Sequence, residues 1–258
     1  VVPGRQRAFV ADRTYASQVL HDGPLGRNWD SALFERLRPL PSGDVDYYDG
    51  TGRRITFEAD GESFVSPEGL ASTLTLGNDG RYYLLEPDRA ITVFDEHGRR
   101  LAFQDRRALA LSGTDGNRHR FLHDAAGRLA SVRDDLGRAI SIGYDTVTGK
   151  LKSIRDFEGR TVDYVVDGAA GTLTAVSGFD PASAKSRRPR TDYQWLGTGG
   201  DLRASLFGAA QLASETDGNG ETPYDVAWNG VSPGSVAGVR LSADGGTTSF
   251  NLARDTRI

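Results

Sequence analysis

Two histidines four residues apart are the first residues in this sequence that could do chemistry. His119 and His123 flank Phe121, and an imidazole pair at this spacing can hold a metal ion when both rings stand on one helix. The surrounding residues instead alternate as in a strand, where all three side chains would share a face. His21 and His97 lie in turn-like stretches without a candidate partner nearby in sequence. We therefore expect no metal site at the histidines.

A group of aspartates near the N-terminus has part of the pattern of a calcium loop. Asp44, Asp46 and Asp49 are close enough in sequence to offer oxygen ligands to one cation. An EF-hand would also need an acidic or amide residue at position 48 and a glutamate at position 55, where the chain has Tyr48 and Ile55. We expect these aspartates to cap turns, with an incidental calcium site as the alternative.

A Gly-Arg pair that recurs along the chain is the third candidate. Backbone amides at a glycine turn and a guanidinium group together suit a phosphate. Even repetition argues against a single anion site, so we expect each arginine to pair with an aspartate of the neighbouring hairpin, in a ladder of ion pairs. Only three of the 31 basic residues are lysine, which leaves 28 arginines. Planar guanidinium groups favour two-point pairing with carboxylates, although a high-GC genome explains the excess equally well.

The tryptophans and an arginine-rich stretch complete the candidates. Trp29, Trp195 and Trp228 are far apart in sequence, and we expect them to pack in the core rather than to line a sugar-binding cleft. Residues 187–190 (Arg-Arg-Pro-Arg) could be a protease site or a polyanion contact, but they belong to a loop-like stretch, 178–192, that we expect to be solvated. No set of serine, threonine and carboxylate residues stands out as catalytic. The sequence thus predicts no enzyme, no cofactor and no metal.

Composition narrows the classes of function further. The 258 residues are 38% hydrophobic and carry a formal net charge of −4, which gives no electrostatic reason to expect nucleic acid or an anionic membrane as a partner. No apolar run approaches the roughly 18 residues of a membrane-spanning helix. Cysteine is absent, which excludes disulfides and thiolate catalysis. The chain begins Val1-Val2-Pro3, without methionine or signal peptide, and we expect it to be a piece of a longer protein.

The glycines indicate how these residues are positioned. Many of the 32 glycines fall in an Asp-x-x-Gly-Arg motif that follows a short strand-like run. Glycine supplies the positive φ of a tight turn, and the aspartate can bond the backbone two residues on. Good copies of the motif begin at Asp49, Asp95, Asp124, Asp134 and Asp156. Two looser copies, at 145–150 and 167–172, have one extra residue before the glycine.

Between residues 121 and 178 the motif becomes periodic. Successive turn glycines are alternately 10 and 12 residues apart, so the repeating unit is 22 residues long and contains two turns. Each unit leaves two segments of about five to seven residues, the usual strand length, and therefore predicts a β-hairpin. We assign the structural repeat motif to Asp124, Gly127, Arg128, Leu129, Asp134, Gly137, Arg138, Tyr144, Asp145, Gly149, Leu151, Asp156, Gly159, Arg160, Asp167, Gly171 and Leu173.

Elsewhere the hairpin pattern is less regular. Residues 46–58 and 91–104 read as strand, turn and strand, and an Asp-Gly pair precedes a strand-like run at 81–85. Residues 202–214 fit a short helix or, because Gly208 interrupts them, an irregular segment. The sequence therefore predicts an all-β fold in which antiparallel β-hairpin repeats extend one sheet.

The changing regularity divides the chain into three regions. We expect an N-terminal β region at 1–110, the regular repeats at 111–178, and a loop insertion followed by degenerate repeats at 179–258. Free strand edges are expected at the C-terminal end of such a ribbon.

Tandem Tyr-Asp-x-x-Gly-Arg-Leu units with a second Asp-x-x-Gly-Arg between them resemble the Rhs/YD-repeat family. The fullest unit runs from His123 to Tyr144 and Asp145. Residues 23–29 and 46–57 resemble the region that often precedes the repeats in bacterial Rhs proteins. The resemblance covers nearly the whole chain and is weakest at residues 178–215. Several copies have lost the tyrosine or the arginine, as is expected where a motif serves packing and turns.

The resemblance implies a spiralling β-shell, or cocoon, that encloses a C-terminal toxin domain of the same polypeptide. Implied partners are that toxin domain, further YD repeats, and a secretion-system spike or adaptor. The chain has no match to the family's self-cleaving aspartate motif, so we expect it to be an early part of such a shell.

The implied function is non-catalytic encapsulation within a polymorphic toxin or secreted effector of interbacterial competition. Such a protein is made in the cytoplasm and delivered by a bacterial route such as type VI secretion, and cell-surface association is a further option. The alternative function is a cell-surface YD-repeat module that binds carbohydrate or protein.

Overall fold

The computed structural model describes residues 11–16, 21–61, 63–105, 118–178, 189–196, 211–217, 224–228, 236–243 and 246–251. β-Strands dominate these residues, and helix within them is limited to one 3-10 turn, η1 (Ala32–Phe34). The hydroxyl oxygen of Ser31 caps that turn by accepting a hydrogen bond from the Leu33 amide. The prediction of an all-β fold is confirmed. Within the described ranges, no helix is long and apolar enough to cross a membrane.

The strands are short and follow one another closely along the chain. The N-terminal ones are β1 (Thr14–Tyr15), β2 (Asp22–Gly23), β3 (Gly26–Arg27) and β4 (Trp29–Asp30). Next come β5 (Arg36–Pro39), β6 (Val45–Tyr48), β7 (Arg54–Asp60), β8 (Ser63–Val65), β9 (Thr73–Leu76), β10 (Tyr82–Leu85), β11 (Ile91–Phe94), β12 (Arg100–Gln104), β13 (Arg118–His123), β14 (Leu129–Asp134) and β15 (Ala139–Tyr144). The last are β16 (Leu151–Arg155), β17 (Thr161–Val166), β18 (Leu173–Ser177), β19 (Arg190–Leu196), β20 (Gln211–Thr216), β21 (Tyr224–Trp228), β22 (Val236–Ala243) and β23 (Gly246–Asn251).

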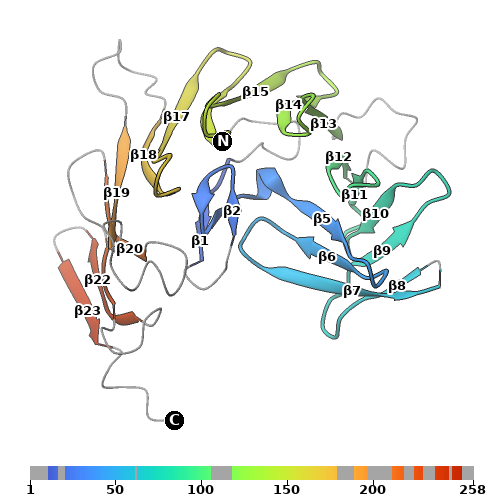
Figure 1. Ribbon diagram of the computed structural model, residues 1–258, viewed down its shortest axis with the longest axis horizontal. Coiled ribbons are helices and arrows are strands. Elements are labelled where there is room, and N and C mark those ends of the chain that lie inside the picture. The colour runs from blue at the N-terminus through green and yellow to red at the C-terminus, as the bar shows by residue number, and fades with distance from the viewer. Residues whose placement is uncertain are drawn as a thin grey trace. The chain divides into compact units, whose positions relative to one another are not determined.

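Neighbours in sequence are neighbours in the sheet. Each strand from β5 to β15 pairs antiparallel with the next one along the chain. The same order holds from β16 to β23. The run of hairpins from β9 to β12 can be followed in Figure 1. The expected extension of one antiparallel sheet by successive hairpins is therefore found within each of these runs.

The chain divides into two compact units. The first unit contains Val1–Thr14, Asp30–Ile142 and Asp156–Gly159, and the second contains Tyr15–Trp29, Gly143–Arg155 and Arg160–Ile258. The expected division at residues 110 and 178 follows the regularity of the repeat rather than compactness, and it stays a prediction.

Alternation of side chains explains why the repeat segments form half-buried strands. In β15, Ile140 and Ile142 are buried while Ser141 between them is exposed. Ile140 lies opposite the buried Val132 of β14, so apolar side chains meet on one face of the sheet. The leucine that follows the turn at 124–128 is the first residue of β14 and is also buried.

The best-defined core of the first unit lies between β5 and β11. Leu37, Val45, Ile55, Phe57, Leu74, Tyr82, Leu84 and Phe94 form one buried cluster. Phe57 and Phe94 are completely buried, and truncating a side chain of this size in a packed core costs several kcal/mol, about 3–5. This core comes from the part of the chain where the repeat is least regular.

The hairpins expected outside the periodic region are confirmed. Residues 46–58 form β6, a turn and β7; residues 91–104 form β11, a turn and β12; and the Asp79-Gly80 turn joins β9 to β10.

Two expectations near the C-terminus need correction. Residues 211–214 belong to strand β20 and not to a helix, while 202–210 lie outside the described residues. β20 is strand because it pairs with β19, which overrides the helical propensity of its alanine and leucine. The loop expected at 178–192 ends earlier, because β19 already begins at Arg190; residues 179–188 lie outside the described residues.

Candidate functional site

The Asp-x-x-Gly-Arg turns are the candidate functional site, and the copy at 95–99 shows their construction. The Asp95 Oδ1 atom accepts hydrogen bonds from the amides of His97 (3.0 Å) and Arg99 (2.8 Å). Arg99 Nε donates to the Asp95 Oδ2 atom at 2.6 Å. Backbone bonds from Asp95 N to Arg99 O and from Gly98 N to Asp95 O close the turn, both at 2.9 Å. Gly98 has a φ of 79°, the left-handed conformation that favours glycine.

The copies at 124–128 and 134–138 repeat these bonds. In each, one carboxylate oxygen accepts the amides of the second and fourth residues after the aspartate, at 2.9–3.0 Å. The other oxygen accepts the arginine Nε, at 2.9 Å in the first copy and 2.7 Å in the second. At 156–160 the Glu158 amide bonds the Asp156 carboxylate and Gly159 N bonds Asp156 O.

The turns hold their carboxylates in the charged form. Burial works against the charge on Asp95, but hydrogen bonds from the Arg99 backbone and side chain outweigh it and hold the pKa of Asp95 below its usual value. At Asp124 the leading cause is the hydrogen bond from the Arg128 amide, which likewise lowers the pKa. Each of these carboxylates is therefore matched with the arginine of its own turn.

This pairing corrects the ion-pair ladder expected between hairpins. Arg99, Arg128 and Arg138 each pair with the aspartate four residues earlier in the same turn. The five-residue turn folds the arginine back over its own carboxylate, at 2.6–2.8 Å. Arg99 does reach the next hairpin, but through packing: a Cβ atom added at Gly127 would come within 3.0 Å of its NH1 atom. A guanidinium engaged by its own turn is also poorly placed to bind phosphate.

The two looser copies are built differently. In the turn at 145–150, the Asp145 carboxylate accepts the amides of Val147 and Thr148, the second and third residues after it. In the turn at 167–172, the Asp167 carboxylate likewise accepts the amides of the second and third residues. The extra residue thus moves the end of the turn away from the carboxylate, and in both turns the carboxylate is occupied by amides of the second and third residues.

The remaining residues of the repeat motif lie where each hairpin begins or ends. Leu129, Leu151 and Leu173 are the first residues of β14, β16 and β18, and all three are buried. Tyr144 ends β15, and Arg160 immediately precedes β17. Gly127, Gly137, Gly149, Gly159 and Gly171 all have positive φ. The described motif residues thus serve turns and strand starts.

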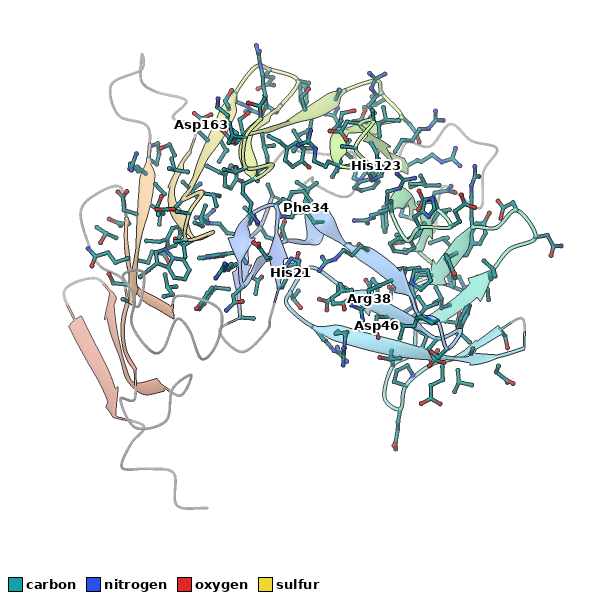
Figure 2. All side chains as sticks on the ribbon, in the orientation of Figure 1. His21, Phe34, Arg38, Asp46, His123 and Asp163 are labelled. Atoms are coloured by element: carbon teal, nitrogen blue, oxygen red, sulfur yellow. The ribbon has the colours of Figure 1, made fainter. Side chains whose placement is uncertain are left out.

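The candidate histidines stand on β13. His119 lies opposite Asp134, and its ring is 6.2 Å from that of Phe103. His123 lies at a register shift at the end of the strand and is labelled in Figure 2. Burial, with the Arg99 charge, lowers the pKa of His123 and favours the neutral ring. Across the described parts of the chain, no group of three His, Asp or Glu side chains could hold a metal ion.

The acidic residues considered for calcium have other partners. Asp46 is 2% exposed and forms ion pairs with Arg38 (3.2 Å) and Arg54 (4.0 Å); Arg38 and Asp46 are labelled in Figure 2. Thr56 Oγ1 donates to the Asp46 Oδ1 atom at 2.7 Å. Asp49 accepts the amide of Thr51, two residues on, as the turn-capping expectation requires. Asp44 instead accepts the amide of Ala59 in β7, so its carboxylate joins its turn to a strand.

Two tryptophans that are far apart in sequence share one aromatic cluster. In the second unit, Trp29 lies 5.0 Å from Tyr193 and 5.3 Å from Tyr15, measured between ring centroids. Trp195 lies edge-on to both Tyr15 and Trp29, and its Nε1 atom donates to the Leu173 carbonyl. Rings packed against one another in this way form core, as expected, and not an open sugar platform. The side chain of Trp228 lies outside the described residues.

A half-buried polar cluster was missed by sequence reasoning. Tyr47 Oη donates to Glu35 Oε1 at 2.9 Å, and Arg100 NH1 lies 2.8 Å from Glu35 Oε2. Burial raises the pKa of Tyr47, and the Glu35 charge adds to this effect. The Arg100 guanidinium also lies over the Phe121 ring at 4.3 Å. No local motif joins residues so distant in sequence, so no sequence signal could have found them.

The N-terminal segment contacts turns of the repeat through its backbone. In the first unit, Leu37 N donates to the Gly98 carbonyl at 2.9 Å. In the second unit, Arg27 N donates to the Gly171 carbonyl and Leu151 N donates to the Pro24 carbonyl, both at 2.7 Å. The glycine turns thus serve two purposes, because they reverse the chain and also present carbonyl groups to another segment.

Comparison with known proteins gives one match at the N-terminus. Residues 1–57 match a family model described as a domain of unknown function, DUF6531. No curated protein matches the chain.

Solved structures with some likeness include complexes named TcdB2-TccC3 and TcdB2-TccC3-Cdc42, each 16% identical, with TM-scores of 0.32 and 0.33. They cover 83% and 82% of this chain, which spans 13% and 12% of theirs. A porin-like protein from Bacteroides uniformis is 11% identical with a TM-score of 0.27, over 84% of this chain and 91% of that one. At these values the likenesses carry no argument about activity or partners.

The fold and the turns together define an all-β protein built from tandem antiparallel hairpins. Its 22-residue unit contains two strands and two aspartate–glycine turns. The tandem hairpins on which the resemblance to the Rhs/YD-repeat family rests are therefore present in the structure.

Proposed function

We propose that this chain is a structural segment of a β-shell in an Rhs/YD-repeat toxin, where it helps to enclose a C-terminal toxin domain until delivery. The observation that carries the proposal is the self-contained turn. Arg99, Arg128 and Arg138 each pair with the aspartate of their own turn, so in these three turns the charge of the carboxylate is matched four residues further along the chain. Such units suit a long wall made of many hairpins.

The chemistry of the described residues supports a non-catalytic role. The carboxylates with lowered pKa are engaged by amides and arginines of their own turns. Two polar groupings away from the turns, around Asp46 and around Glu35, join β-strands to one another. Delivery by a bacterial secretion route, including type VI secretion in competition between bacteria, is part of the proposal.

The first test is the reading frame that contains this sequence. We expect further Asp-x-x-Gly-Arg hairpins after residue 258, followed by an unrelated short domain, and a small immunity gene downstream. A reading frame that ends without such a domain overturns the proposal.

The second test uses the product of the whole reading frame. We expect the downstream domain to resist protease while the sheet is folded and to be cut rapidly once denaturant unfolds it. Equal cleavage in both conditions means that the domain is not enclosed.

A further inference from the structure

The two turns that depart from the repeat motif are the two that contact one N-terminal hairpin. This hairpin consists of β2 and β3, in which Asp22 lies opposite Arg27 and Gly23 opposite Gly26. It contacts the turn at 145–150 and the turn at 167–172, the six-residue copies of the motif. Both turns and the hairpin belong to the second unit.

Lys150 makes the contact with the first of these turns. Its Nζ atom donates to Asp22 Oδ1 and to the Gly23 carbonyl, the latter at 3.1 Å. The adjacent Leu151 amide donates to the Pro24 carbonyl at 2.7 Å. Lys150 is only 17% exposed, whereas Arg99 and Arg128, its counterparts in five-residue turns, are 41% and 43% exposed.

The second turn receives the other strand of the hairpin. Arg27 N donates to the Gly171 carbonyl at 2.7 Å. A Cβ atom added at Gly26, whose φ is 94°, would come within 2.6 Å of that carbonyl oxygen. Thr172 stands where a five-residue turn has its arginine and is buried. A long side chain that folds back over the turn is therefore absent at the point where the hairpin docks.

The extra residue explains why the Lys150 ammonium group contacts the N-terminal hairpin and does not fold back over Asp145. In a five-residue turn the aspartate accepts the amide of the fourth residue and the guanidinium of the same arginine. In the turn at 145–150 the aspartate accepts the amides of Val147 and Thr148 and the Thr148 hydroxyl. The carboxylate is satisfied before the chain reaches Lys150, whose ammonium group then points to the N-terminal hairpin.

We infer that the six-residue turns are the docking site that positions the N-terminal hairpin, with Lys150 as its positioning residue. Because only these two turns depart from the motif in this way among the described copies, they mark a single docking position for the hairpin. Identical five-residue turns would instead offer the hairpin many equivalent positions along the sheet. The inference is independent of the proposed function.

The test measures amide hydrogen exchange at residues 22–29 in the full chain. Replacing residues 145–150 with Asp-Ala-Ala-Gly-Arg, the sequence of 124–128, is expected to raise exchange at Arg27 at least about tenfold, since the Lys150 contacts are lost with the turn. Lys150→Gln is expected to raise it about three- to five-fold, the size of a single partly exposed ion pair. Ile140 and Ile142 in β15 serve as internal references.

Two matched controls separate docking from general loosening. Lys152→Gln removes the same charge from an exposed neighbouring position and is expected to leave exchange at 22–29 unchanged. The double change Asp135→Ala/Leu136→Ala gives the turn at 134–138 the same sequence as the replacement and is also expected to have no effect there. Unchanged exchange in both Lys150→Gln and the turn replacement overturns the inference, as does an equal rise in Lys152→Gln.

A double-mutant cycle decides the matter if the turn replacement unfolds the chain. Asp22→Asn and Lys150→Gln should each raise exchange at residues 22–29, and together they should raise it no more than the larger single change. Fully additive effects would show that the two residues act separately and would overturn the inference.

Discussion

The turns at Gly98 and Gly137 have the same internal structure and different surroundings. Both glycines have a φ of 79°, and in both turns the arginine Nε lies 2.6–2.7 Å from the aspartate Oδ2 atom. A Cβ atom added at Gly98 would overlap the Leu37 carbonyl, whereas one added at Gly137 would meet no atom within 4 Å. At Gly98 the backbone of another segment packs against the glycine, whereas the turn at Gly137 contacts another turn only through its arginine in the contacts described, since Arg138 lies over the Phe157 ring at 5.0 Å.

The difference separates two reasons for a glycine in the motif. The left-handed backbone is needed in every copy, because the turn itself requires it. Close approach of a second backbone is needed only where a segment docks. The motif predicts the left-handed backbone of the turn. It does not predict which turns are approached closely by a second backbone.

The largest expected effect tests this separation directly. Gly98→Ala should lower the free energy of unfolding by about 3–4 kcal/mol, because it adds a clash with backbone to the cost of a left-handed alanine. Gly137→Ala should cost about 1 kcal/mol, the backbone term alone. Urea unfolding of both variants measures the difference. Equal losses would mean that Leu37 does not press on Gly98 in solution.

The second-largest expected effect, the loss of the turn aspartate, should be the same in both turns. Asp95→Ala and Asp134→Ala each remove two amide hydrogen bonds and one arginine pair, so each should cost about 2 kcal/mol. A loss at Asp95 that clearly exceeds the loss at Asp134 would contradict the view that the internal bonds are independent of docking.

The pH dependence of the Asp95 variant provides a second measurement. The folded state holds the pKa of Asp95 below its ordinary 3.8. Its contribution is therefore present above that pH and lost as the pH falls through the lower folded value. Asp95→Ala should flatten the acid limb of the stability curve.

The smallest expected effect concerns His123, which lies near Arg99 of the turn at 95–99. Burial and the Arg99 charge lower its pKa from 6.5, although Asp95 and Asp124 act in the opposite direction. As the pH falls below 6.5 the unfolded chain takes up a proton that the folded chain resists, so stability falls. His123→Gln should remove this slope between pH 6.5 and 5 in urea titrations, and an unchanged slope would exclude His123 as its source.

Much of the hairpin pattern could be predicted because its causes are local. Each turn is determined within five consecutive residues, by an aspartate that caps the amide two residues on and by a glycine at the left-handed position. The turns at 49–53, 95–99 and 124–128 could therefore be located from sequence. The alternation of Ile140, Ser141 and Ile142 likewise specifies which face is buried.

The contacts between distant segments could not be predicted. Leu37 meets Gly98, and Tyr15 meets Trp195, only after many strands have paired. The predicted pairing was also wrong for Arg99, Arg128 and Arg138, because the choice between an arginine's own aspartate and that of a neighbouring hairpin depends on three-dimensional distances. Propensity misled at 211–214, where pairing with β19 overrides the helical preference of the residues.

The 22-residue unit has a consequence for how such a gene can change in length. Each unit carries the chain across the sheet and back again, so the deletion or duplication of one unit leaves every later strand running in its original direction. An insertion of only 10 or 12 residues would reverse all of them and exchange the two ends of every hairpin that follows. Unequal recombination between copies therefore conserves strand polarity only when it adds or removes whole units, so that the sheet lengthens or shortens by one hairpin at a time.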